Sequence, residues 1–151
     1  MQEIITLSRA NAEVYHTDKP WACISIVTEE EDRPKIHADN KLIGLLQLTF
    51  GDYDTEKYLQ ECKDEGRVDK DVRLFDESDA ASILEFVERL QFEIDILMIH
   101  CNMGYSRSPA VAGALSKIYF NEDERFFKSY QPNMHVYRTI LSLWEKRLKA
   151  R

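Results

Sequence analysis

The sequence lacks any long run of apolar residues, and we therefore expect no membrane-spanning helix. Such a helix needs roughly 20 consecutive apolar residues, and no run in this chain approaches that length. The start of the chain also lacks the charged and then apolar segment of a secretory signal. Repeats, low-complexity tracts and linkers are absent as well, so the 151 residues are expected to form one domain over 1–151.

Cysteine is scarce, with three residues at Cys23, Cys62 and Cys101. A small, odd number of cysteines does not provide a disulfide framework, and their spacing matches no metal-binding pattern. We therefore expect a reducing, cytoplasmic setting. We also expect a protein that uses no metal and no other cofactor.

Positive charge is outnumbered, because 20 Lys and Arg face 27 Asp and Glu, which gives a net charge of −7. An acidic surface repels the phosphates of nucleic acids and anionic lipid headgroups. Broad surfaces for nucleic acid or membranes are therefore not expected, although a local basic pocket is compatible with this charge. The sequence does not predict the oligomeric state.

Apolar residues form strand-like and helix-like segments that alternate along the chain. Strands are predicted at 4–7, 21–27, 45–50 and 94–99, and residues 29–34 are expected to form a solvated loop. Helices are predicted from Ser8, near 58–59, from Ser78 or Asp79, over 109–120 and 122–129, and around the apolar series 136, 140, 144 and 148. This alternation predicts an α/β fold with a mostly parallel central sheet and helices on both faces.

The stretch from Ile99 to Ser108 carries the strongest chemical signal. It places Cys101 six positions before Arg107, between a predicted strand and a predicted helix. A tight loop at a helix N-terminus directs backbone N–H groups and the helix dipole toward an anion. A cysteine in that field becomes a nucleophilic thiolate, and an arginine fork holds two phosphate oxygens. Gly104 permits a sharp turn.

The string His-Cys-x-x-Gly-x-Ser-Arg-Ser at 100–108 resembles the phosphate-binding loop of the protein tyrosine phosphatase superfamily, and 104–109 looks most like its dual-specificity branch. Two further segments resemble this family. Residues 48–52 stand where an earlier strand leads to the general-acid aspartate, and 131–133 resembles a Pro-Asn before the final helix. The interval from Asp52 to Cys101 is longer than in compact members.

The resemblance implies a role for each residue of the loop. Cys101 is then the nucleophile and Ser108 stabilises its thiolate. His100 supports the loop through hydrogen bonds and helps to lower the pKa of the thiol. The expected substrate-binding residues are Asn102, Met103, Gly104, Tyr105, Ser106 and Arg107. Asp52 is the expected general acid, with Asp54, Asp76 and Asp79 as alternatives, of which Asp79 is favoured as a helix cap. Asn133 either braces the loop or caps the last helix.

The implied activity is a cysteine-dependent phosphatase that acts on phosphotyrosine, with phosphoserine and phosphothreonine as further candidates. Its partner is then a phosphorylated protein or a small phosphate ester. Two alternatives stay open: a phosphatase of phosphoinositides or RNA 5′-phosphates, and an inactive module that binds phosphate esters. The sequence also leaves open whether residues 53–75 cover the site as a lid.

Overall fold

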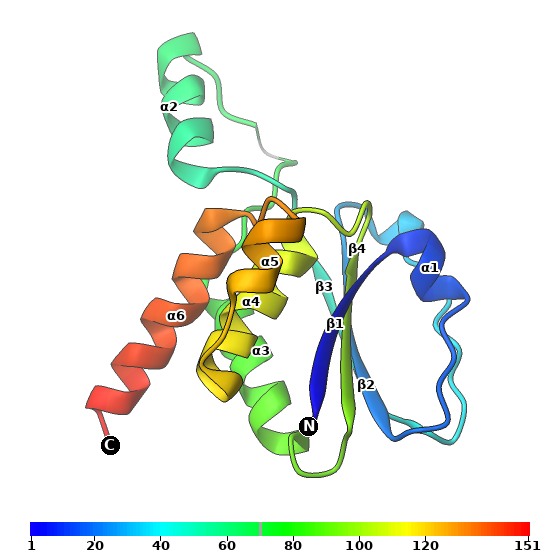
Figure 1. Ribbon diagram of the computed structural model, residues 1–151. Coiled ribbons are helices and arrows are strands. Elements are labelled where there is room, and N and C mark those ends of the chain that lie inside the picture. The colour runs from blue at the N-terminus through cyan, green and yellow to red at the C-terminus, as the bar shows by residue number, and fades with distance from the viewer. Residues whose placement is uncertain (70) are drawn as a thin grey trace.

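The computed structural model describes residues 1–69 and 71–151, and these contain one sheet of four parallel strands (Figure 1). The strands are β1 (Glu3–Ser8), β2 (Trp21–Val27), β3 (Leu42–Thr49) and β4 (Ile96–Cys101), in the spatial order β1-β4-β2-β3. The helices are α1 (Arg9–Glu13), the short 3₁₀ helix η1 (Glu30–Asp32), α2 (Thr55–Glu65), α3 (Glu77–Leu90), α4 (Arg107–Phe120), α5 (Glu124–Ser129) and α6 (Met134–Lys149).

The two central strands, β2 and β4, are buried along their whole length. Their near-continuous apolar sequences fit this position, because a parallel strand covered on both faces has no solvent side. The parallel register aligns the strand ends, so that Ser8 of β1 lies beside Cys101 of β4 and Val27 of β2 beside Thr49 of β3. All four carboxyl ends therefore meet at one edge of the sheet, where such folds bind ligands.

Helices cover the two faces of the sheet unequally (Figure 1). One face packs against α3 and α4, with α5 and α6 outside them, and the main apolar core lies between these layers. The other face carries α1 and a smaller cluster that includes Trp21, Ile36 and Met98. This arrangement confirms the predicted α/β fold with a parallel sheet and helices on both faces. None of the helices in the described residues is long and apolar enough to cross a bilayer.

Several predicted boundaries are wrong by a few residues. Helix α3 is capped by Asp76 and not by Ser78 or Asp79, because the side chains of Asp76 and Asp79 each accept a hydrogen bond from the other's backbone N–H. Helix α4 begins at Arg107, two residues before the expected start, and β3 begins at Leu42. The expected loop at 29–34 contains η1.

Candidate active site

The loop between β4 and α4 encloses a cavity of about 210 Å³ at the carboxyl edge of the sheet. Cys101, the last residue of β4, is only 2% exposed, and its side chain contributes to the cavity wall. The remaining lining residues are Asp52, Asn102, Met103, Tyr105, Ser106 and Arg107. The structure thus brings together the expected nucleophile and the expected arginine, at the two ends of one loop, and the expected acid, which follows β3.

Three carbonyl groups of the loop accept hydrogen bonds from neighbouring segments. The Asn102 carbonyl accepts from the backbone N–H of Arg9 at 3.0 Å, and the Tyr105 carbonyl accepts from Gln131 at 3.1 Å. The Ser106 carbonyl accepts from the N–H of Asn133 at 3.0 Å. Within the described residues, the N–H groups of 103–106 donate to no protein acceptor. A loop with engaged carbonyls and free N–H groups has the polarity that an anion requires.

Gly104 allows this loop to turn against the end of β1. Its φ is +70°, in the left-handed region that side chains disfavour. A Cβ at this position would lie 2.7 Å from the Leu7 carbonyl carbon and 2.7 Å from the Ser8 nitrogen. Both backbone conformation and space therefore require glycine here.

The Cys101 sulfur lies 3.2 Å from the Ser108 Oγ, at the start of α4. Ser108 is fully buried, and its hydroxyl also lies 2.5 Å from the Thr6 Oγ1 of β1. Three side chains from β1, β4 and α4 thus form a continuous hydrogen-bonded chain that ends at the sulfur. A hydroxyl that donates to a thiolate stabilises the charged form.

Arg107 is buried, and two strand ends hold its guanidinium. Its Nη1 donates to the Thr28 Oγ1 at 2.9 Å and to the Phe50 carbonyl at 2.7 Å. Guanidinium groups carry five N–H donors in a rigid fork, so one nitrogen can be anchored while the rest of the fork serves the cavity. Arg107 also lines the cavity beside Cys101.

Asp52 stands at the mouth of the cavity with one carboxylate oxygen fixed. Its Oδ1 accepts from the Ser106 Oγ and from the Asn133 Nδ2, each at 2.9 Å. Asn133 also donates to the Tyr53 carbonyl and caps α6 by accepting from the N–H of Val136. Asn133 therefore performs both tasks that the sequence left open, because its amide carries a donor and an acceptor.

The three alternative aspartates lie at helix starts and do not line the cavity. Asp54 accepts from the N–H of Lys57 at the start of α2. Asp76 caps α3, and Asp79 is buried in an ion pair with Arg73, 2.7 Å apart. Of these four aspartates, Asp52 has the position that a proton donor to the cavity needs.

His100 lies beneath the reactive loop and does not line the cavity. Burial, assisted by Arg33 and Arg107, lowers the pKa of its imidazole to about 4. The Nε2 lies 2.5 Å from the Ser25 hydroxyl, which also accepts from Arg33 at 3.2 Å. A neutral His100 supplies hydrogen bonds but no positive charge that would favour the Cys101 thiolate, and its support of the loop stays a prediction.

The outer residues of the loop differ in exposure. Met103 is 82% exposed and Tyr105 is 47% exposed, so both stand at the rim of the cavity and offer apolar surface to a ligand. Within residues 1–69 and 71–151, no group of three His, Cys, Asp or Glu side chains is arranged to hold a metal ion.

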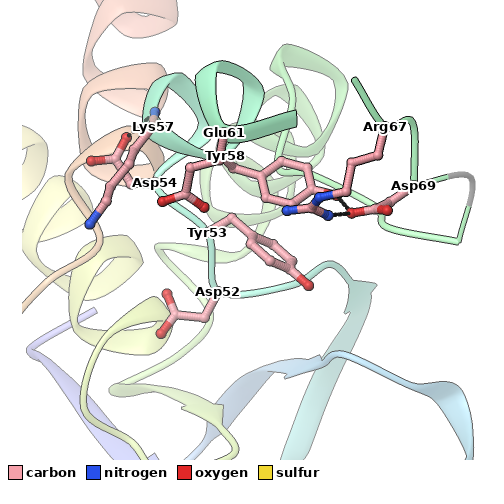
Figure 2. Close-up of a pocket in the computed structure, with 8 residues that line it drawn as sticks. All are labelled: Asp52, Tyr53, Asp54, Lys57, Tyr58, Glu61, Arg67 and Asp69. Atoms are coloured by element: carbon pink, nitrogen blue, oxygen red, sulfur yellow. Dashed lines mark hydrogen bonds and ion pairs between the residues drawn. The ribbon is translucent and has the colours of Figure 1, made fainter. Parts of the chain in front are cut away.

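A second cavity, of about 470 Å³, shares Asp52 with the first and lies under α2 (Figure 2). The rings of Tyr53 and Tyr58 lie 4.7 Å apart on its wall. Arg67 pairs with Glu65 and Asp69, and Asp69 also accepts from Tyr58. Lys57 contributes a further cation, and the other lining residues are Asp54 and Glu61. We refer to it below as the α2 cavity.

The α2 cavity occupies part of the long interval between Asp52 and Cys101. Helix α2 extends beyond the carboxyl edge of the sheet, away from the packed layers (Figure 1). The segment 53–75, which the sequence leaves open as a lid, therefore lines a cavity of its own. Residue 70 of this segment lies outside the described residues.

Sequence reasoning missed three polar residues that hold the site. Thr6 reaches Ser108, Thr28 reaches Arg107, and Ser25 reaches His100. The sequence does contain a signal for two of them, because Thr6 and Ser25 are polar residues inside strands that are otherwise apolar. Such residues need hydrogen-bond partners when they are buried.

The fold is similar to that of a solved tyrosine-phosphatase-like protein. No protein-family model matches the sequence, and no curated protein is significantly similar to it. The structure of the human tyrosine phosphatase-like serine/threonine/tyrosine-interacting protein matches with a TM-score of 0.53 and 19% identity, covering 84% of this chain and 78% of that one. Human DUSP28 matches with a TM-score of 0.49 and 16% identity, over 97% and 94% of the two chains. The chain therefore has a tyrosine-phosphatase-like fold, which confirms the fold that its loop sequence implies.

Proposed function

We propose that this protein is a cysteine-dependent phosphatase that hydrolyses phosphate monoesters, with phosphotyrosine as the preferred substrate. The observation that carries the proposal is the convergence of Cys101, Arg107 and Asp52 on one cavity of about 210 Å³, enclosed by a loop whose N–H groups at 103–106 donate to no acceptor in the described residues. A nucleophile, an anion cradle and a proton donor are the three parts that metal-free phosphoryl transfer requires.

In the first step the Cys101 thiolate attacks phosphorus, so that a P–S bond forms while the P–O bond to the leaving group breaks. The leaving oxygen takes a proton from the Asp52 carboxyl group. Arg107 and the loop N–H groups stabilise the charge on the three equatorial oxygens. Anchorage of Arg107 by Thr28 and the Phe50 carbonyl limits reorganisation of the guanidinium.

In the second step water attacks the phosphocysteine, and the Asp52 carboxylate accepts a proton from that water. The new P–O bond replaces the P–S bond, and inorganic phosphate leaves. The departing Cys101 thiolate accepts a hydrogen bond from Ser108, whose Oγ lies 3.2 Å from the sulfur. Asp52 is then protonated again, and both catalytic groups have returned to their starting states.

Charge around the cavity favours an aryl phosphate over a polyphosphorylated headgroup. The loop positions 102, 103 and 105 carry no cation. Lys57 and Arg67 line the neighbouring α2 cavity, where Arg67 is already paired with two carboxylates. One phosphate site with the apolar rim of Met103 and Tyr105 suits phosphotyrosine.

Hydrolysis of a chromogenic aryl phosphate in the presence of EDTA tests the proposal. The wild type is expected to turn over without metal, and Cys101→Ser is expected to lose turnover while it still binds phosphate esters. Cys23→Ser, which changes a buried cysteine on β2, is the matched control for activity. A wild type that binds the ester without turnover would favour the binding-module alternative. Comparable turnover in Cys101→Ser would contradict the mechanism.

Comparison of kcat/KM for a phosphotyrosine peptide, a phosphoserine peptide and a soluble phosphoinositide tests the substrate class. We expect the phosphotyrosine peptide to be the best substrate. A tenfold advantage for the phosphoinositide would overturn this choice and would point to Lys57 and Arg67 as its ligands.

A further inference from the structure

The hydroxyl chain behind the reactive cysteine includes a residue to which the proposed mechanism gives no task. Thr6 of β1 lies 2.5 Å from the Ser108 Oγ, which lies 3.2 Å from the Cys101 sulfur. Ser108 is fully buried and Cys101 is 2% exposed. The contact between these two buried groups is electrostatically stronger than the same contact in water.

The directions of the hydrogen bonds follow from the number of protons. A serine hydroxyl has one proton to donate and can accept two hydrogen bonds. When Cys101 is a thiolate it has no proton, so Ser108 must donate to the sulfur. The single Ser108 proton is then used, and the contact with Thr6 is a hydrogen bond only if Thr6 donates.

We infer that Thr6 is a positioning residue that orients the Ser108 hydroxyl as a donor to the Cys101 thiolate. The inference rests on the proposed function for its catalytic meaning. Donation from Thr6 polarises the Ser108 hydroxyl and makes it a better donor to sulfur. It thereby stabilises the thiolate both before attack and when it leaves in the second step.

The fold keeps Thr6 in this place. Strand β1 pairs with β4 along its length, with Thr6 opposite Ile99 and Ser8 opposite Cys101. Side chains alternate across a strand, so Ile5 and Leu7 pack on the α1 side while Thr6 faces α4. The register that places Cys101 at the sheet edge therefore also places the Thr6 hydroxyl against the start of α4.

Thr6 also lines a third cavity, of about 220 Å³, on the outer side of β1 with Arg125 and Tyr130. Water from this side can replace a deleted hydroxyl, which makes alanine an ambiguous substitution. Valine has nearly the shape of threonine and fills the same space without a donor. Serine restores the donor without the methyl group. The informative pair is therefore Thr6→Val and Thr6→Ser.

The experiment measures alkylation of Cys101 by iodoacetate as a function of pH, together with steady-state kinetics on an aryl phosphate. For Thr6→Val we expect the half-maximal pH of alkylation to rise. We expect kcat to fall about five- to tenfold, which corresponds to the loss of one hydrogen bond, while KM changes little. Thr6→Ser should restore both quantities. Thr139→Val, at a hydroxyl bonded within α6, is the control for an unrelated threonine.

The alkylation profile separates failure of this inference from failure of the proposed function, because it needs no turnover. A protein without phosphatase activity, in which Thr6→Val still shifts the profile, would refute the function and retain the role of Thr6. An unshifted profile in folded Thr6→Val, with full activity, would overturn the inference. If both variants lose activity equally and share the wild-type alkylation profile, Thr6 serves packing alone.

Discussion

Asp52 lines two cavities, and the side chains around these cavities are held to different degrees. In the reactive cavity, Cys101 and Arg107 are buried, and hydrogen bonds reach the site from β1 and from the residues that directly follow β2 and β3. In the α2 cavity, Lys57 and Glu61 are exposed, and its ion pairs involve surface side chains (Figure 2). The first is built on the sheet edge, and the second on a helix that extends away from it.

The side chains of the reactive cavity are therefore fixed in position, whereas those of the α2 cavity are free to change position. Buried, hydrogen-bonded groups on regular elements hold reacting atoms with little reorganisation, as phosphoryl transfer requires. Exposed charged groups in solvent are screened and contribute little each. We therefore expect substitutions in the reactive cavity to change the chemistry, and substitutions in the α2 cavity to modulate the choice of substrate.

The largest contrast is expected between Asp52→Asn and Asp54→Asn. Loss of the proton donor should lower kcat on phenyl phosphate about 10²- to 10⁴-fold. The loss should shrink for esters whose leaving group needs no proton. Asp52→Asn should also remove the basic limb of the pH–rate profile, because the rate falls there as the acid loses its proton. Asp54 caps α2, so Asp54→Asn should retain activity. The reverse pattern would transfer the acid role to Asp54.

The second contrast compares Arg107→Lys with Arg67→Lys. An ammonium group cannot span two phosphate oxygens while it stays anchored to Thr28 and Phe50, so Arg107→Lys should lower kcat about 10²- to 10³-fold. Arg67→Lys keeps a charge beside Glu65 and Asp69 and should leave kcat nearly unchanged. An equal loss of kcat in the two variants would mean that the two cavities do not differ in their contribution to the reaction.

Two glycines with positive φ provide a stability test. Replacing Gly104 or Gly66 by alanine places a side chain on a left-handed backbone, which lowers the free energy of unfolding by about 1–2 kcal/mol. Only at Gly104 does the new Cβ also collide with backbone, at 2.7 Å from Leu7 and Ser8, whereas the space around Gly66 is open. Chemical denaturation should therefore give a lower free energy of unfolding for Gly104→Ala than for Gly66→Ala. Equal values would mean that the loop relaxes away from β1.

His100 should make the protein sensitive to acid. Its pKa lies at about 4 in the folded state against an ordinary 6.5, so the unfolded chain binds more protons between these values. This contribution to stability is complete above pH 6.5 and is lost as the pH falls to 4, with a total of about 3 kcal/mol. His100→Gln should flatten the dependence of the unfolding free energy on pH over this range. An unchanged slope would assign the acid sensitivity to other groups.

The smallest effect is expected for Lys57→Ala, which removes an exposed cation from the α2 cavity. On phosphotyrosine peptides, we expect kcat/KM to change less than about fivefold. The variant should favour peptides with a basic flanking residue and disfavour acidic ones. A tenfold loss on every peptide would mean that Lys57 takes part in the reaction itself.

The sequence predicted the parts of the molecule whose signal is local. The loop at 100–108 and the apolar strands that precede it depend on neighbours in the chain, and they predicted the fold and the residues of the cavity. The caps of α3 were misassigned because Asp76 and Asp79 both suit a helix start, and only the observed pair of hydrogen bonds decides between them. Hydroxyl partners such as Thr6 and Thr28 depend on strand order, which no local pattern encodes.

The anchorage of Arg107 and Ser108 has a consequence for folding kinetics. The contacts of Thr6 with Ser108, Thr28 with Arg107 and Asp52 with Asn133 span 102, 79 and 81 residues of sequence. Closing such long loops is entropically costly, so contacts of this kind form late and slow the folding of the whole chain. Regain of catalytic competence should therefore coincide with the slowest refolding phase, and fragments that lack either end of the chain should be inactive.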